Sequence, residues 1–144
     1  WRISMASIHN DIRAALETHI STTANLPDIA YENVAFDPTT GTSFISVRYM
    51  PTSTRPAVRG LNPQLRYQGV FYVTVSTPEG NGPSTADDYV NKVINAFQAT
   101  TDISFTNAQS ETIKLSIDYA ERQQGLIDSP WYYVPINIGW YIYK

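Results

Sequence analysis

The sequence of 144 residues has a mass of 16.2 kDa, 42% hydrophobic residues and a formal net charge of -3 at pH 7, which predicts one folded domain with its own core. The negative charge argues against general electrostatic attraction to nucleic acid, and the absence of cysteine excludes disulfides, thiol nucleophiles and cysteine-ligated zinc. Only 16% of the residues are charged, against an average of about 25%, while ten tyrosines and three tryptophans favour a surface that contacts other proteins.

An amphipathic helix is predicted first, capped by Ser7 and ending near Ser21. Apolar residues recur along it at three- and four-residue spacing, which gives it one apolar face. That face comprises Ile8, Ile12, Ala15, Leu16 and Ile20, and the opposite face comprises Asn10, Asp11, Arg13 and Glu17. His9 and His19 lie ten residues apart and, at about 100° per residue, point in different directions. We therefore expect ordinary surface or half-buried histidines and no two-ligand metal pair.

Two strands are expected after this helix. The first candidate is the short segment 29–34, and turn residues follow it at 37–42. The second candidate, 44–50, alternates apolar and polar side chains, and its apolar side comprises Ile45, Val47 and Tyr49. Pro51 is expected to end this second strand.

The region 51–68 is the least regular part of the chain and predicts a long hairpin loop that projects from the sheet. Four arginines occur from Arg48 to Arg66, whereas residues 38–78 contain no Asp or Glu. One interpretation is a solvated loop that its arginines keep soluble. The interpretation we favour is a contact surface that binds acidic partners through bidentate pairs from Arg55, Arg59 and Arg66. Nucleic acid has less support, because phosphate binders carry Lys and Arg over a wider face.

The clearest unit of the sequence is a strand, a turn and a helix within residues 68–97. The strand 69–76 alternates, and six turn-forming residues stop it. Ser84 is expected to cap the helix, with Asp87 in capping-box position and Asp88 beside it, where the helix dipole favours negative charge. Capping explains these carboxylates better than acid–base catalysis, because neighbours on a helix diverge. The apolar stripe that should pack on the sheet comprises Ala86, Tyr89, Val90, Val93, Ile94 and Phe97.

The C-terminal part of the chain predicts further strands. Residues 102–105 are a short strand or an irregular link, and 113–121 form a strand with one apolar face. Pro135 lies inside the final strand and suggests an edge position or a bulge. The apolar face of that strand comprises Tyr132, Val134, Ile136, Ile138, Trp140 and Ile142. The aromatic residues of its other face, which are either covered by the first helix or form an interface, are Trp131, Tyr133, Tyr141 and Tyr143.

This order of elements predicts an α+β fold: a mainly antiparallel β-sheet with two α-helices packed on one face and a long Arg-rich hairpin loop. Residues 5–144 should form a single domain, and residues 1–4, which precede Met5, are expected to be a remnant of the expression vector. The sequence contains no P-loop, no Gly-x-Ser-x-Gly elbow and no His-Glu-x-x-His helix. We therefore expect a protein that is not an enzyme and that has no catalytic residues, cofactor or metal site.

The succession of elements and turn residues resembles the tail terminator (tail completion) proteins of long, non-contractile-tailed bacteriophages. After a short helix comes an Asn-x-x-Phe-x-Pro segment, then a strand that ends in Arg-Tyr-Met-Pro and a long loop with arginine and glycine. The other matching segments are Tyr-Gln-Gly-Val-Phe-Tyr-Val, Pro-Glu-Gly-Asn-Gly before the second helix, and the closing Tyr-Val-Pro-Ile. In this chain they occupy 33–38, 48–51, 67–73, 78–82 and 133–136.

The resemblance implies a small subunit that assembles as a hexameric ring, caps the finished tail tube, stops its polymerisation and offers a surface to the head. It implies a place in the virion, at the head-proximal end of the tail, after assembly in the host bacterial cytoplasm. The implied partners are other copies of the chain, the tail tube protein and a head-completion protein, with no membrane, and with DNA only passing through the ring lumen.

A ring requires a heterologous contact, in which one patch of each subunit meets a different patch of its neighbour. We expect the basic residues to face the acidic start of the second helix, at the interface between subunits or with the tube. The candidate residues are Arg48, Arg55, Arg59, Arg66, Asp87 and Asp88. Two alternatives remain: another phage head–tail connector, such as a stopper or completion protein, or a small ligand-binding protein or enzyme with a pocket between sheet and helices.

Overall fold

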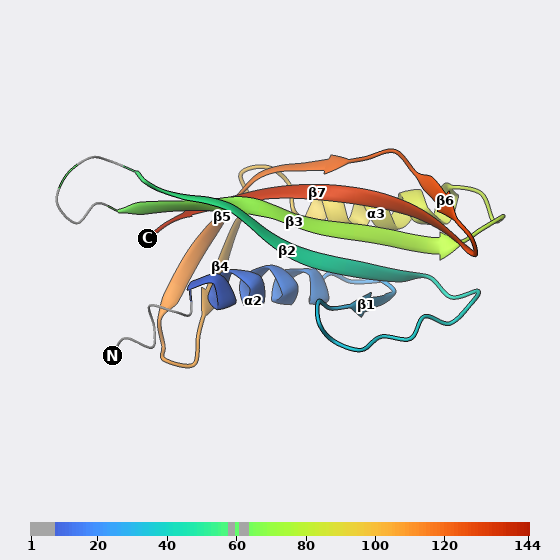
Figure 1. The fold of residues 1–144 in the computed structure, drawn as a ribbon, viewed down its shortest axis with the longest axis horizontal. Coiled ribbons are helices and arrows are strands. Elements are labelled where there is room, and N and C mark those ends of the chain that lie inside the picture. The colour runs from blue at the N-terminus through green and yellow to red at the C-terminus, as the bar shows by residue number, and fades with distance from the viewer. Residues whose placement is uncertain (1–7, 58–59, 61–63) are drawn as a thin grey trace.

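The computed structural model describes residues 8–57, 60 and 64–144. Within these residues the chain forms two helices and seven strands (Figure 1). Neither of the described helices is long and apolar enough to cross a membrane. In chain order the elements are α2 (Ile8–Ser21), β1 (Asp28–Ala30), β2 (Phe44–Pro56), β3 (Leu65–Pro78), α3 (Ser84–Ala96), β4 (Asp102–Thr106), β5 (Thr112–Arg122), β6 (Leu126–Asp128) and β7 (Trp131–Tyr143).

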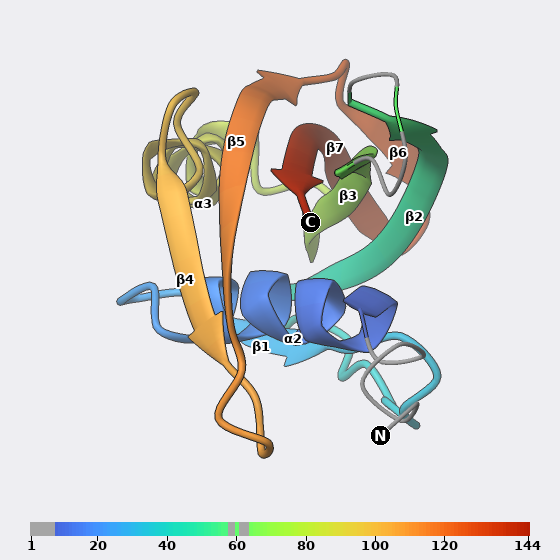
Figure 2. The same cartoon turned by 90° about the vertical axis from the view of Figure 1, so that its left-hand side faces the viewer.

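The strands form one curled, mixed sheet in the order β1-β2-β3-β7-β5-β4, with β6 paired to β7. The short β1 runs parallel to β2, and the other paired strands run antiparallel. Figure 2 looks along the long strands and shows the curl, with β4 and β5 on one side, β2 on the other and α2 crossing between them. The fold is therefore a curled sheet that wraps around its helices.

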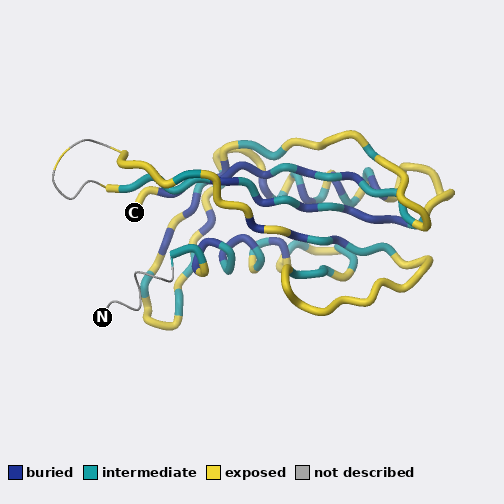
Figure 3. Tube along the Cα trace, viewed as in Figure 1, coloured by how far each residue is buried: buried dark blue, intermediate teal, exposed yellow. Residues whose placement is uncertain are grey.

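One apolar cluster joins both helices to the inner face of the sheet. The alternation predicted for the strands is confirmed, because Phe71 and Val73 of β3 are fully buried while Tyr72 between them is half-buried. Figure 3 shows this alternation along the long strands. The helices contribute Ile12, Ala15, Leu16 and Ile20 from α2 and Ala86, Val90 and Val93 from α3, so both predicted apolar faces are confirmed.

Several predicted boundaries and side-chain positions are wrong at the helices. Pro83, not Ser84, is the N-cap of α3, and no side chain caps this helix. The reason is that Pro83 already has φ -87° and ψ -7°, so helical backbone begins one residue before the serine can act as a cap. On α2, Asp11 lies inward rather than on the polar face: it is 6% exposed and accepts a hydrogen bond from Asn107. The predicted cap Ser7 lies outside the described residues.

Strand β2 is longer than predicted. Pro51 does not end it, because the pairing with β3 continues past a register shift between Pro51 and Ser53 and reaches Pro56 opposite Leu65. Most of the segment predicted as an irregular loop is therefore a paired hairpin, and Arg59 lies outside the described residues. The buried Gly69 lies opposite Pro51, and a Cβ added to it would meet the carbonyl oxygen of Met50 at 2.4 Å. The close approach of β2 and β3 at this point therefore requires glycine.

The remaining differences concern short strands and one proline. The strand expected at 29–34 is only Asp28–Ala30, and the positive φ of Asn33, 58°, turns the chain away. The uncertain segment after α3 is strand β4. The edge position or bulge expected at Pro135 is wrong, because β7 lies between β3 and β5 and neither register shifts at this residue. The backbone N–H of Gln123, just beyond the end of β5, donates to the Pro135 carbonyl at 2.8 Å. Pro135 therefore lies where the pairing of β5 with β7 ends, and its missing N–H interrupts no bond of that ladder.

Candidate assembly surface

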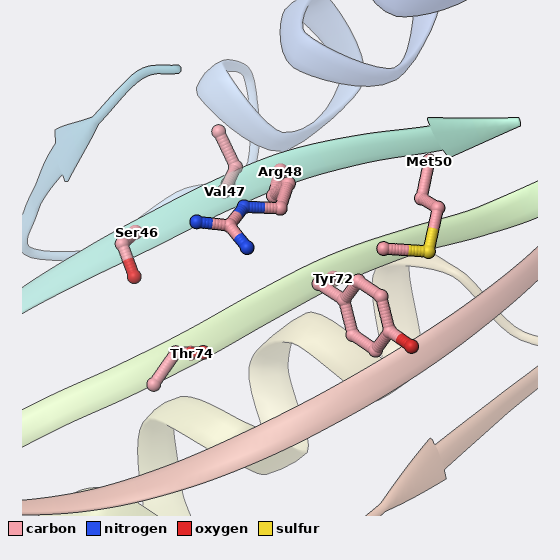
Figure 4. Close-up of a pocket in the computed structure, with 6 residues that line it drawn as sticks. All are labelled: Ser46, Val47, Arg48, Met50, Tyr72 and Thr74. Atoms are coloured by element: carbon pink, nitrogen blue, oxygen red, sulfur yellow. The ribbon is translucent and has the colours of Figure 1, made fainter. Parts of the chain in front are cut away.

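The first candidate surface is the outer face of β2, β3 and β7, away from the helices, which no described helix or strand covers. Alternate residues of these strands point outward and, except for Ser76 and Gly139, are half-buried or exposed. The three strands carry three arginines and no carboxylate. Across the sheet Arg48 faces Tyr72, and Met50 faces Val70. Figure 4 shows the shallow hollow between these two strands, about 490 Å³ in volume, which Ser46, Val47, Arg48, Met50, Tyr72 and Thr74 line.

The paired ends of β2 and β3 extend past the helices as an arm, which we define as residues 52–57 and 64–68 (Figure 1). Here Arg55 and Arg66 lie directly opposite each other. The guanidinium carbon of Arg66 lies 4.8 Å from the ring centroid of Tyr141 and 5.7 Å from that of Tyr143. Like charges opposite each other destabilise a strand pair, so this arrangement favours an anionic partner. The structure therefore brings two of the predicted site arginines together on the arm, with Arg48 farther along the same face.

The two predicted carboxylates lie at the other end of the molecule. Asp87 forms an ion pair with Arg122 at the end of β5, in which Nη1 and Oδ1 lie 2.7 Å apart. The two groups are not aligned as a hydrogen bond, so the contact is electrostatic. Asp88 beside it is exposed. Within one subunit the arginines of the arm and these carboxylates are not brought together (Figure 1).

Near the start of α3 lies a second uncovered surface, which sequence reasoning missed. We call it the end surface and define it as Glu79, Leu126, Ile127 and Asp128. Ile127 is 69% exposed and Leu126 is 46% exposed. The turn before α3 is tied to this region, because Glu79 N–H donates to the Pro130 carbonyl at 3.0 Å and the Ser129 hydroxyl donates to the Glu79 carboxylate. A hollow of about 330 Å³ lies between Glu79, Gly80, Gly82, Pro83, Ile127 and Tyr132.

The exposed edge of β2 is protected against pairing with another strand. Strand β1 covers only residues 44–46, and beyond it the Tyr49 N–H donates to the Glu32 carboxylate at 2.9 Å. Pro51 and Pro56 have no N–H to offer. Natural sheets use charged side chains, prolines and irregular pairing to prevent edge-to-edge association. Contacts of this side of the molecule therefore depend on side chains rather than on strand addition.

Both histidines are half-buried, which is one of the two positions expected for them, and each bonds within the fold. His9 Nδ1 lies 2.6 Å from the Tyr49 hydroxyl, and His19 Nε2 lies 2.7 Å from the Ala96 carbonyl oxygen, which joins α2 to the end of α3. Burial raises the pKa of the Tyr49 hydroxyl above its ordinary value, and the nearby Arg13 guanidinium opposes this rise. Within the described residues, no three His, Asp or Glu side chains gather as a metal site would require.

Two of three comparisons with known proteins found matches, and these cover most of the chain. The sequence matches the family model described as phage tail terminator protein over residues 11–140. One solved structure is 23% identical, with a TM-score of 0.67 and 94% of both chains covered. Another, titled as the virion of a native gene transfer agent (GTA) particle, is 13% identical, with a TM-score of 0.53 and 95% of both chains covered. At these identities the structural matches show a shared fold. A search of curated proteins found no match.

Proposed function

The chain belongs to the phage tail terminator protein family, and from this membership we propose that it forms a ring that caps the phage tail tube. The family gives the chain a structural role in the phage tail. In the proposed role the ring is a hexamer, stops polymerisation of the tube and offers a joining surface to the head. It occupies the head-proximal end of the tail after assembly in the host bacterial cytoplasm. Its partners are other copies of the chain, the tail tube protein and a head-completion protein, and DNA passes through its lumen.

The uncovered outer face is the observation that most supports this role. Arginines and tyrosines are enriched at the centres of protein interfaces, and this face presents both without a single carboxylate on its three strands. The solved structure titled as a virion particle, whose fold this chain resembles, adds support for a place in an assembled particle.

The proposed ring contact is heterologous, with basic residues of one copy facing acidic residues of the next. The candidate residues, at the contact between copies or at the contact with the tube, are Arg48, Arg55, Arg59 and Arg66 on the basic side and Asp87 and Asp88 on the acidic side. Opposite charges at opposite ends of the subunit suit this arrangement, because each copy then offers one end to each neighbour (Figure 1).

The test is to polymerise the purified tail tube protein with and without this chain and to measure tube lengths by electron microscopy. We expect shorter tubes with a ring density at one end, and a free ring of six times 16.2 kDa, about 97 kDa, by light scattering. Tubes of unchanged length without end density would contradict the proposal. Binding to the head vertex rather than to tube ends would instead indicate another head–tail connector.

A further inference from the structure

The arm carries an unneutralised basic site. Arg55 and Arg66 are cross-strand partners, so their side chains share one face of the arm. Among the described residues neither arginine forms an ion pair. Arg66 is already held against two tyrosine rings, and its Nη1 lies 3.4 Å from the Tyr143 hydroxyl. A side chain that is held in place loses little conformational entropy on binding, so the arm is prepared to receive an anion.

The end surface has the complementary chemistry. It combines two carboxylates, Glu79 and Asp128, with two of the most exposed large apolar side chains of the described chain, Leu126 and Ile127. Strand β6, which carries three of these four residues, pairs with β7 and with no other described strand. Exposed apolar residues next to charged groups are typical of a surface that a partner covers.

We propose that the arm of one copy binds the end surface of a second copy, with Arg55 and Arg66 paired to Glu79 and Asp128 over Leu126 and Ile127. This inference rests on the proposed function, since it identifies the contact that would build the ring. It differs from the simpler pairing with Asp87, because Arg122 already occupies that carboxylate within the subunit.

Charge selects this head-to-tail contact over the others that the chain could make with itself. An arm against an arm would place arginines on arginines, and an end surface against an end surface would place carboxylates on carboxylates. The two surfaces lie at opposite ends of the long strands (Figure 1), so each copy can engage two neighbours at once, as a ring requires. Phosphate of nucleic acid could neutralise the arm, but it would leave Leu126 and Ile127 exposed and would meet a chain of net charge -3.

The experiment uses two charge-reversed variants of the full chain. The first, Arg55→Glu with Arg66→Glu, has an acidic arm, and the second, Glu79→Arg with Asp128→Arg, has a basic end surface. Each variant alone should self-associate about 100-fold more weakly than the wild type, because arm and end surface then carry the same charge. A one-to-one mixture should recover the mass of the wild-type assembly with alternating copies. Mass is measured by light scattering over a wide concentration range, and circular dichroism verifies that each variant is folded.

Three results would overturn the inference: variants that associate like the wild type, a mixture that does not recover, or a wild type that stays monomeric at its highest soluble concentration. None of these three results depends on the tube-length assay, which tests the proposed function. The contact between arm and end surface can therefore be wrong while the proposed function is right. If only the acidic-arm variant loses binding to a duplex oligonucleotide and the mixture does not recover, the arm contacts DNA instead.

A matched control reverses charges away from both surfaces. Lys114→Glu with Asp102→Arg exchanges the partners of an exposed ion pair, 3.4 Å apart, between β5 and β4, and should leave the mass unchanged. Because the chain has no cysteine, Arg55→Cys and Ile127→Cys copies can also be joined by a short bis-maleimide. Linkage between the two variants, with little linkage within either one, is expected, and the reverse pattern would overturn the inference.

Discussion

Arg66 and Asp87, both predicted contact residues, are held by their own subunit in different ways. Arg66 packs on Tyr141 and Tyr143, which fixes its position and leaves its charge unneutralised. Asp87 is neutralised by Arg122, and both side chains remain about two-fifths exposed, at 41% and 39%. The two residues therefore differ in what they can offer a partner, although the sequence presents both simply as charged.

Replacing Arg122 with alanine tests the ion pair within the subunit. We expect the free energy of unfolding to fall by up to about 1 kcal/mol at low salt, because exposed ion pairs contribute little and salt screens them. Urea denaturation at low and high ionic strength measures this difference, which should shrink with salt. The double variant Arg122→Ala with Asp87→Asn is the control, since removing both charges should cost less than leaving Asp87 alone. Equal losses for the single and double variants would contradict a stabilising pair.

The buried hydroxyl of Tyr49 limits the stability of the fold at alkaline pH. Burial raises the pKa of its hydroxyl above the ordinary value of about 10, so the folded chain keeps a proton that the unfolded chain loses. This contribution to stability is complete below pH 10 and is lost as the pH rises from there toward the pKa of the folded state. Unfolding in urea at pH 8 and pH 11 should show a smaller loss of stability for Tyr49→Phe than for the wild type. An equal loss would assign the alkaline limit to other tyrosines.

Strand β2 illustrates what a sequence does and does not predict about an element. Its first half alternates clearly, and the buried side was predicted correctly. Its second half, with two prolines, resembles a loop, yet it pairs with β3 because the register shift at Pro51 lets the ladder continue. Whether a missing N–H faces a neighbouring strand or solvent depends on tertiary pairing, which no local pattern contains.

The edge protection of β2 predicts a local effect of Glu32. Its carboxylate accepts the Tyr49 N–H at 2.9 Å, so Glu32→Ala should raise the hydrogen-exchange rate of that amide roughly tenfold, the effect of losing one net hydrogen bond. Glu32→Gln is the matched control, because its amide oxygen can still accept. The amides of β3 should be unaffected in both variants. Unchanged exchange at Tyr49 in Glu32→Ala would show that the carboxylate does not protect the edge.

The candidate site, like strand β2, has one part that the sequence predicted and one part that it did not. The arginines were found from charge alone, because 38–78 contains no carboxylate. The end surface was missed, since Leu126 and Ile127 are two adjacent apolar residues in a short link and give no periodic signal. Their one sequence signal is an apolar pair within a polar connection, which becomes informative only when the structure shows both side chains exposed.

Over the whole molecule, a ring built through the arm and the end surface leaves the middle of the outer face uncovered. The hollow around Arg48, Met50 and Tyr72 lies on β2 and β3, between the arm and the far ends of these two strands (Figures 1 and 4). A ring that ends a tube needs a surface for the tube in addition to its subunit contacts, and this face has the arginine and aromatic composition of such a surface. We therefore expect it to serve a partner other than the neighbouring copy.

The variant Arg48→Glu separates assembly of the ring from binding to the tube. The variant should keep the mass of the wild-type assembly in light scattering, because Arg48 belongs to neither the arm nor the end surface. It should lose the ability to shorten tubes of the tail tube protein, since a carboxylate would replace the one cation in the hollow. Tube lengths measured by electron microscopy, with Thr74→Ser as the matched control, decide the outcome. Loss of ring mass would place the hollow within the subunit contact, and full capping activity would show that the tube binds elsewhere.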